Sequence, residues 1–80
     1  MPVVLRYKGY RFFFYADEGD PREPVHVHVR HERCEAKFWL HPDVRLAYNR
    51  RFDDRTLAEL AEVVRQHRAS IEEQWHAFFA

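Results

Sequence analysis

The chain has 80 residues, of which 46% are hydrophobic and 16% aromatic, and its 13 Lys and Arg balance 13 Asp and Glu. This length suits one domain, and the aromatic content excludes a disordered chain. The zero net charge argues against bulk electrostatic capture of nucleic acid or an anionic membrane, although it permits a local basic patch. No stretch reaches the roughly 20 apolar residues of a membrane span. A single cysteine and an N-terminus unlike a secretory signal predict a cytoplasmic protein.

Residues 3–15 predict a β-hairpin. They are rich in β-branched and aromatic side chains on both sides of Lys8-Gly9, which suits a two-residue turn. The turn brings two arginines face to face, which is unfavourable unless water or an anionic partner lies between them. The predicted register pairs Val3 with Phe14, Leu5 with Phe12 and Arg6 with Arg11.

Residues 16–24 predict an acidic loop rich in turn-forming residues. Loops of this composition are commonly solvated connectors. Alternatively, a carboxylate from the loop lies beside the histidines of the strand that follows. The candidates for that role are Asp17, Glu18, Asp20 and Glu23.

Valine and histidine alternate through residues 25–29. Because side chains of a β-strand point alternately to opposite faces, the valines share one face, and His26 and His28 share the other. The valines suit a core. We therefore expect both imidazoles to lie together on the sheet surface that is turned away from the covering helix.

The strand at residues 25–31 is predicted to pair with residues 34–41 in a second hairpin. A two-residue turn at Glu32-Arg33 sets apolar side chains opposite one another, whereas a three-residue turn would set valines opposite charges. The predicted register pairs Val25 with Leu40, Val27 with Phe38, Val29 with Ala36, Arg30 with Glu35, His28 with Lys37 and His26 with Trp39.

The C-terminal third, from about residue 54 to residue 79, predicts one long helix. Apolar residues recur there at steps of three and four, and Asp53 suits the N-cap with a hydrophobic staple around it. A short apolar run at residues 44–48 predicts a fifth strand or an extended segment that crosses the sheet. The sequence therefore predicts a single α+β domain over residues 1–80. In it, an antiparallel sheet of four to five strands (two hairpins, about residues 3–48) packs on the long C-terminal helix.

The end of that helix predicts an interface. About 25 helical residues span about 37 Å, whereas an 80-residue globule is only about 30 Å across. The last turns, with Trp75, Phe78 and Phe79, would then overhang the sheet and pack on a second subunit or another protein. The alternative is that the N-terminal hairpin reaches them.

The sheet face that the helix leaves open is predicted to be a wet, aromatic and basic binding surface, because grouped aromatic residues and arginines are typical of interfaces. Its partner would be another small protein or a second copy of the chain. Replacing both histidines by Ala is then expected to leave the fold intact and to weaken partner capture. The surface comprises Arg6, Arg11, Phe13, Tyr15, His26, His28, Arg30, Lys37 and Trp39.

The histidine pair also allows metal binding, and a metal-dependent hydrolase centred on these histidines is an alternative function. Two histidines on one strand face can share an ion, and zinc needs at least one further ligand, here His41 or Glu23. No Cys-x-x-Cys or His-x-x-x-His pattern supports such a site, so no cofactor is predicted and a divalent metal stays an alternative.

Two further alternatives involve nucleic acid. His26 and His28 are candidate catalytic residues for acid–base cleavage of RNA, with basic neighbours as a phosphate clamp. Nucleic-acid binding without catalysis would instead show an affinity that falls steeply with salt.

The segments Glu23-Pro24-Val25-His26-Val27-His28-Val29 and Glu35-Ala36-Lys37-Phe38-Trp39-Leu40 resemble the small bacterial domain of unknown function family 4160. The resemblance extends through residues 45–49 and the C-terminal helix. It implies a short prokaryotic, cytoplasmic protein without an established activity, encoded beside another small uncharacterised domain. Such two-gene arrangements imply a partner protein, as in a toxin–antitoxin-like pair. Relatives often have Gly where this chain has Arg51.

Overall fold

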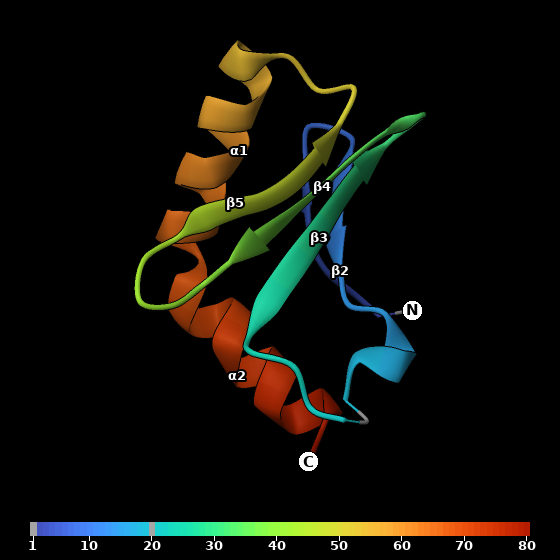
Figure 1. Cartoon of the computed structure of the whole chain (residues 1–80), viewed down its shortest axis with the longest axis vertical. Coiled ribbons are helices and arrows are strands. Elements are labelled where there is room, and N and C mark those ends of the chain that lie inside the picture. The colour runs from blue at the N-terminus through green and yellow to red at the C-terminus, as the bar shows by residue number, and fades with distance from the viewer. Residues whose placement is uncertain (1, 20) are drawn as a thin grey trace.

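The computed structural model describes residues 2–19 and 21–80, so Asp20 lies outside the described residues. Within them, the strands form one antiparallel sheet in chain order, and two helices follow (Figure 1). The predicted α+β class and fifth strand are confirmed. The elements are β1 (Val3–Tyr7), β2 (Tyr10–Phe13), the 3-10 turn η1 (Ala16–Glu18), β3 (His26–His31), β4 (Cys34–Trp39), β5 (Arg45–Arg50), α1 (Asp54–Gln66) and α2 (Arg68–Phe78).

The second hairpin has the register that the sequence predicts. It follows from the alternation of valine and histidine, because a slip by one residue would turn every valine away from the core. The facing pairs are His26 with Trp39, Val27 with Phe38, His28 with Lys37, Val29 with Ala36 and Arg30 with Glu35.

The first hairpin departs from its predicted register at the open end. Val3 lies opposite Phe13 rather than Phe14, because an irregularity between Val3 and Leu5 shifts the pairing. The shift leaves Phe14 outside β2, where its ring is fully buried against Trp75 of α2. The confirmed pairs are Leu5 with Phe12 and Arg6 with Arg11.

The core lies between one face of the sheet and the two helices (Figure 1). The valines of β3 supply its sheet side, and apolar residues at helical spacing supply the other side. Its fully buried members include Phe12, Val27, Val29, Ala36, Leu40, Leu60 and Val64. No helix of the described residues combines the length and the hydropathy that crossing a membrane requires.

The prediction of one long C-terminal helix is wrong. His67 has φ −110° and ψ 14°, which ends α1, and α2 begins at the next residue. His67 occupies a position on the apolar stripe between Val64 and Ile71, where a polar ring does not suit the core. Its Nδ1 atom instead lies 3.0 Å from the carbonyl oxygen of Val63. The break lets α2 change direction at the end of the sheet.

The predicted overhang of the helix end is therefore wrong for two of its three aromatic residues. Trp75 and Phe79 are 0% and 9% exposed, and both pack against Phe14, so the N-terminal hairpin does reach them. Phe78 stays 43% exposed. Bending around the sheet buries these rings within the chain, without a second copy.

Three tight turns of the described residues use left-handed backbone, one of them at Glu32, which has φ 55° in the turn of the second hairpin. Lys8 and Gly9 have φ of 48° and 84°, as the predicted two-residue hairpin turn requires. Arg51 has φ 74°, a left-handed conformation that glycine adopts most easily. The turn before α1 therefore has a glycine-like conformation even though Arg occupies it.

Replacing Asp53 by Ala should lower the free energy of unfolding by about 1 kcal/mol. Oδ1 of Asp53 accepts a hydrogen bond of 2.7 Å from the backbone N–H of Thr56, and Ala leaves that donor unpaired. Urea denaturation monitored by circular dichroism measures the loss. The control is Asp54→Ala in the next position, which removes no cap. An equal loss in both variants would contradict this assignment.

Candidate functional site

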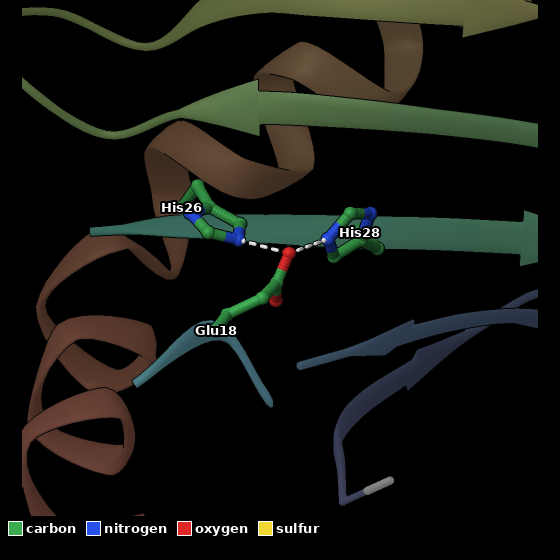
Figure 2. A group of neighbouring side chains, drawn as sticks. All are labelled: Glu18, His26 and His28. Carbon is green, nitrogen blue, oxygen red and sulfur yellow. Dashed lines mark hydrogen bonds and ion pairs between the residues drawn. The ribbon is translucent and has the colours of Figure 1, made fainter. Parts of the chain in front are cut away.

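A carboxylate and two imidazoles converge on the sheet face opposite the valines. β3 places His26 and His28 side by side there, as the alternation predicts. Glu18 comes from η1, in the segment that joins β2 to β3, and its carboxylate points between the two rings (Figure 2). Among the candidate carboxylates that the structure describes, Glu18 is the one that converges with both histidines.

One oxygen of Glu18 faces both histidines. Oε2 lies 2.6 Å from Nε2 of His28 and 2.8 Å from Nε2 of His26. The other oxygen, Oε1, accepts a hydrogen bond of 3.0 Å from the backbone N–H of Tyr15. The hydrogen bond from the Tyr15 N–H holds Oε1, and the turn of η1 thereby directs Oε2 at the two imidazoles.

The prediction that these histidines lie on an open surface is wrong. His26 and His28 are 0% and 3% exposed, and Phe13 beside them is 1% exposed. The ring of His28 packs against those of Phe13 and Tyr15. His26 packs against Trp75 of α2, with ring centroids 4.8 Å apart, because the bend at His67 carries α2 around the sheet end. His26 is therefore not turned away from the helices.

A second buried carboxylate lies on the far side of His28. Glu35 is 4% exposed, and Oε2 accepts a hydrogen bond of 2.6 Å from the hydroxyl of Tyr48. The hydroxyl of Tyr15 lies 3.2 Å from both oxygens of Glu35. Oε2 of Glu35 lies 3.6 Å from Nδ1 of His28. Neither Glu35 nor Tyr48 is among the site residues that the sequence predicts, although the predicted register set Glu35 opposite Arg30 on the same face of the sheet.

The proton position of His26 follows from its neighbours. Nδ1 lies 2.8 Å from the carbonyl oxygen of Pro24, which can only accept, so Nδ1 carries the proton. Nε2 is buried, and no atom of the described residues forms an aligned hydrogen bond with it. A neutral His26 therefore presents an unpaired lone pair next to the carboxylate of Glu18.

Burial and charge set the ionisation of the cluster. Burial is the largest effect on His28 and holds its pKa below the usual 6.5, against the opposing hydrogen bond to Glu18. Burial alone would raise the pKa of Glu18. The hydrogen bonds from His28 and the Tyr15 N–H, with the favourable electrostatic interaction of the two nearby imidazoles, outweigh it and lower that pKa below 4.5. Burial and the nearby Glu35 raise the pKa of Tyr48, so this hydroxyl keeps its proton.

The remaining residues of the predicted surface lie outside this buried cluster. Lys37 pairs with Glu23, with Nζ 3.3 Å from Oε1, and lies over the ring of Trp39. Glu23 approaches the other nitrogen of His26, Nδ1, at 3.9 Å, and does not join the three converging atoms. The arginines of the predicted surface, Arg6, Arg11 and Arg30, are exposed or half-buried.

The other predicted metal ligand, His41, lies away from the cluster. It is exposed beyond the end of β4, and its Nε2 lies 2.8 Å from Oε1 of Glu72. Nε2 of His76 approaches the same carboxyl group at 3.5 Å. His41 thus joins Glu72 and His76 of α2 in a surface group. This group has the same residue types as the buried cluster, but it is exposed.

Comparison with known proteins identifies a family, but it does not identify an activity. A profile of the family described as Domain of unknown function (DUF4160) matches residues 9–76, a span that contains the whole cluster. No curated protein and no solved structure matches the chain.

Lowering the pH from 7 to 5 should lower the free energy of unfolding. Because the pKa of His28 is below 6.5 in the folded protein, the unfolded chain takes up this proton first as the pH falls. Stability from His28 is therefore complete above about pH 6.5 and is lost as the pH falls below it. The depressed pKa of Glu18 adds a further loss below about pH 4.5.

Urea denaturation at several pH values tests this dependence. His28→Gln should flatten the pH dependence between about 6.5 and 5. A wild-type stability that is constant or rises over this interval would refute the assignment.

Replacing both His26 and His28 by Ala should destabilise the fold by about 3–5 kcal/mol. This reverses the expectation from sequence, because Glu18 would stay buried without either partner. Thermal and urea denaturation measure the effect. In the control, His41 and His76 are both replaced by Ala, and these exposed positions should cost less than about 1 kcal/mol. Equal stability of the two double variants would show that the buried cluster contributes nothing to the fold.

Proposed function

The chain belongs to the DUF4160 family, a domain of unknown function, and we propose that it binds one divalent metal ion of the zinc class between Glu18, His26 and His28. The observation that carries this proposal is Nε2 of His26. This atom is buried, has no aligned hydrogen bond among the described residues, and faces an anionic oxygen.

The arrangement of protons favours a cation at this point. Nδ1 of His26 donates to the carbonyl of Pro24, so Nε2 of a neutral ring is a lone pair. A lone pair and a carboxylate oxygen 2.8 Å apart repel each other, and the nitrogen is buried away from water. A metal ion bound to both atoms would remove the repulsion and satisfy the orphaned nitrogen.

The donor set suits zinc. Two imidazole nitrogens and one carboxylate oxygen lie within 4.8 Å of one another. In a tetrahedral site with bonds of about 2.0–2.1 Å, donor atoms are about 3.3 Å apart. The distances of 2.6 and 2.8 Å would therefore widen by about 0.5–0.7 Å. Glu18 lies in a short turn outside the sheet, where such a movement disturbs no strand pairing.

The opposite nitrogen of each ring has the environment typical of a metal ligand. Ligating histidines commonly direct the other ring nitrogen at a carbonyl or carboxylate, which fixes the ring orientation. Pro24 provides that carbonyl for His26, and Glu35 provides a carboxylate 3.6 Å from Nδ1 of His28. The lowered pKa of His28 also keeps this ring neutral, and therefore able to bind metal, at neutral pH.

In this proposal the ion joins the segment between β2 and β3 to the sheet. Three protein donors leave a fourth position for water, which is the pattern of catalytic zinc. A hydrolytic or RNA-cleaving role is less well supported, because the two imidazoles are 0% and 3% exposed and a substrate would have to reach them. We therefore propose that the role of the ion is structural, in that it fixes the segment between β2 and β3 to the sheet.

Titration of chelator-treated protein with Zn²⁺ tests the proposal. One equivalent should bind, and free Zn²⁺ at 100 times the dissociation constant should raise the free energy of unfolding by about 2.7 kcal/mol. Calorimetry gives the stoichiometry, and urea denaturation with and without Zn²⁺ gives the stabilisation. His26→Gln and Glu18→Gln should each abolish the stabilisation.

The exposed group on α2 offers a matched control. His41→Gln with His76→Gln removes two histidines beside Glu72 and should leave zinc binding unchanged. If His26→Gln does not fold, visible absorption of Co²⁺ bound to wild type and to Glu18→Gln replaces the stability measurement. Undiminished binding in Glu18→Gln, or no binding to wild type, would reject the site.

A further inference from the structure

A row of charged side chains crosses the helix-free face from one edge of the sheet to the other. Arg6 lies opposite Arg11, Arg11 opposite Arg30, Arg30 opposite Glu35, and Glu35 opposite Arg50. Residues directly opposite each other in neighbouring strands point to the same side of the sheet. These five residues, the arginine row, therefore form one line across all the strands from β1 to β5.

The arginine row keeps an excess of positive charge. Its one acid, Glu35, is buried and accepts hydrogen bonds from two tyrosine hydroxyls, and Nε of Arg30 lies 3.6 Å from it. Arg6, Arg11 and Arg50 are exposed. Within the part of the chain that the structure describes, these three form no ion pair.

The net charge of the chain is zero, but positive and negative charge are divided unequally between the sheet and the helices. Residues 1–52 carry ten Lys or Arg against seven Asp or Glu, whereas residues 53–80 carry three against six. The helices thus collect the excess acid, and the sheet collects the excess base. Arginines facing each other across strands are unfavourable in the free protein, so an anion on this face would relieve a repulsion that the fold retains.

We propose that the arginine row binds the phosphate backbone of a single-stranded nucleic acid. Guanidinium groups form paired hydrogen bonds with phosphate oxygens. Strands lie about 4.8 Å apart, so the row extends over about 19 Å. A nucleic acid carries a negative charge at every nucleotide, whereas a protein partner would need a dedicated run of acidic residues to match the row.

An exposed aromatic ring beside the row favours a single strand over a duplex. Tyr48 lies on β5 two residues before Arg50, and it faces Lys37 on the same side of the sheet. It is 38% exposed, which leaves ring surface on which a base can stack. Bases of a duplex are already stacked on each other and do not offer this contact.

Fluorescence anisotropy with a labelled 20-nucleotide oligouridine tests the proposal. If four arginines contact phosphates, affinity should fall about 50-fold between 50 and 200 mM salt. Arg11→Gln with Arg50→Gln should reduce this to about sevenfold and weaken binding at 50 mM salt at least tenfold. The melting temperature of this variant should be unchanged or higher, because facing like charges are removed.

A charge-matched control comes from the helix layer. Arg55→Gln with Arg65→Gln removes the same charge at exposed positions of α1 and should leave binding within twofold of wild type. Equal weakening in both double variants would overturn the proposal, because the effect would then follow net charge. Chelator treatment should not change RNA affinity, so this result is independent of the metal site.

Polyglutamate of similar length separates the two classes of partner. Binding as tight as that of oligouridine, and lost in the variant lacking Arg11 and Arg50, would overturn the nucleic-acid proposal in favour of an acidic protein. Absence of oligouridine binding at 50 mM salt would overturn it as well. Preference for oligouridine, together with the weaker salt dependence of the variant, would support it.

Discussion

The carboxylate of Glu18 between two buried imidazoles is the contact on which the rest of this face depends. Together with the pairs Lys37–Glu23 and Tyr15–Glu35, it ties the segment between β2 and β3 to the sheet, and it gives the buried rings of His26 and His28 a polar partner. The turn of η1 places Oε1 within hydrogen-bond distance of the Tyr15 N–H and Oε2 next to both imidazole rings. A loop carboxylate thereby becomes part of the interior, and its pKa falls even though burial opposes ionisation.

The bend at His67 brings a side chain of α2 into contact with the cluster. A straight helix would carry Trp75 past the end of the sheet, whereas α2 turns and places that indole against Phe14 and His26. The same rearrangement buries Phe79. The break in the helix and the burial of the histidines are therefore one packing solution, in which the chain's own elements enclose these aromatic residues.

The helix-free face has two parts with different physical character. The part near the start of β3 is closed, and its charges are paired or neutralised within the chain. The arginine row across the middle of the strands is open, and its like charges repel. Glu35 belongs to both parts, because it lies in the row and also accepts hydrogen bonds from Tyr15 and Tyr48 beside His28. Charge on the row can thus influence the buried site through one carboxylate.

The sequence by itself determined the second hairpin and the shared face of His26 and His28, because only one register keeps every valine in the core. It also determined the cap at Asp53, which is a local signal. Only the tertiary structure decided which carboxylate meets the histidines and that both rings are buried. The path of the loop and the direction of α2 depend on packing between aromatic residues far apart in the chain, and such contacts leave no periodic pattern in the sequence.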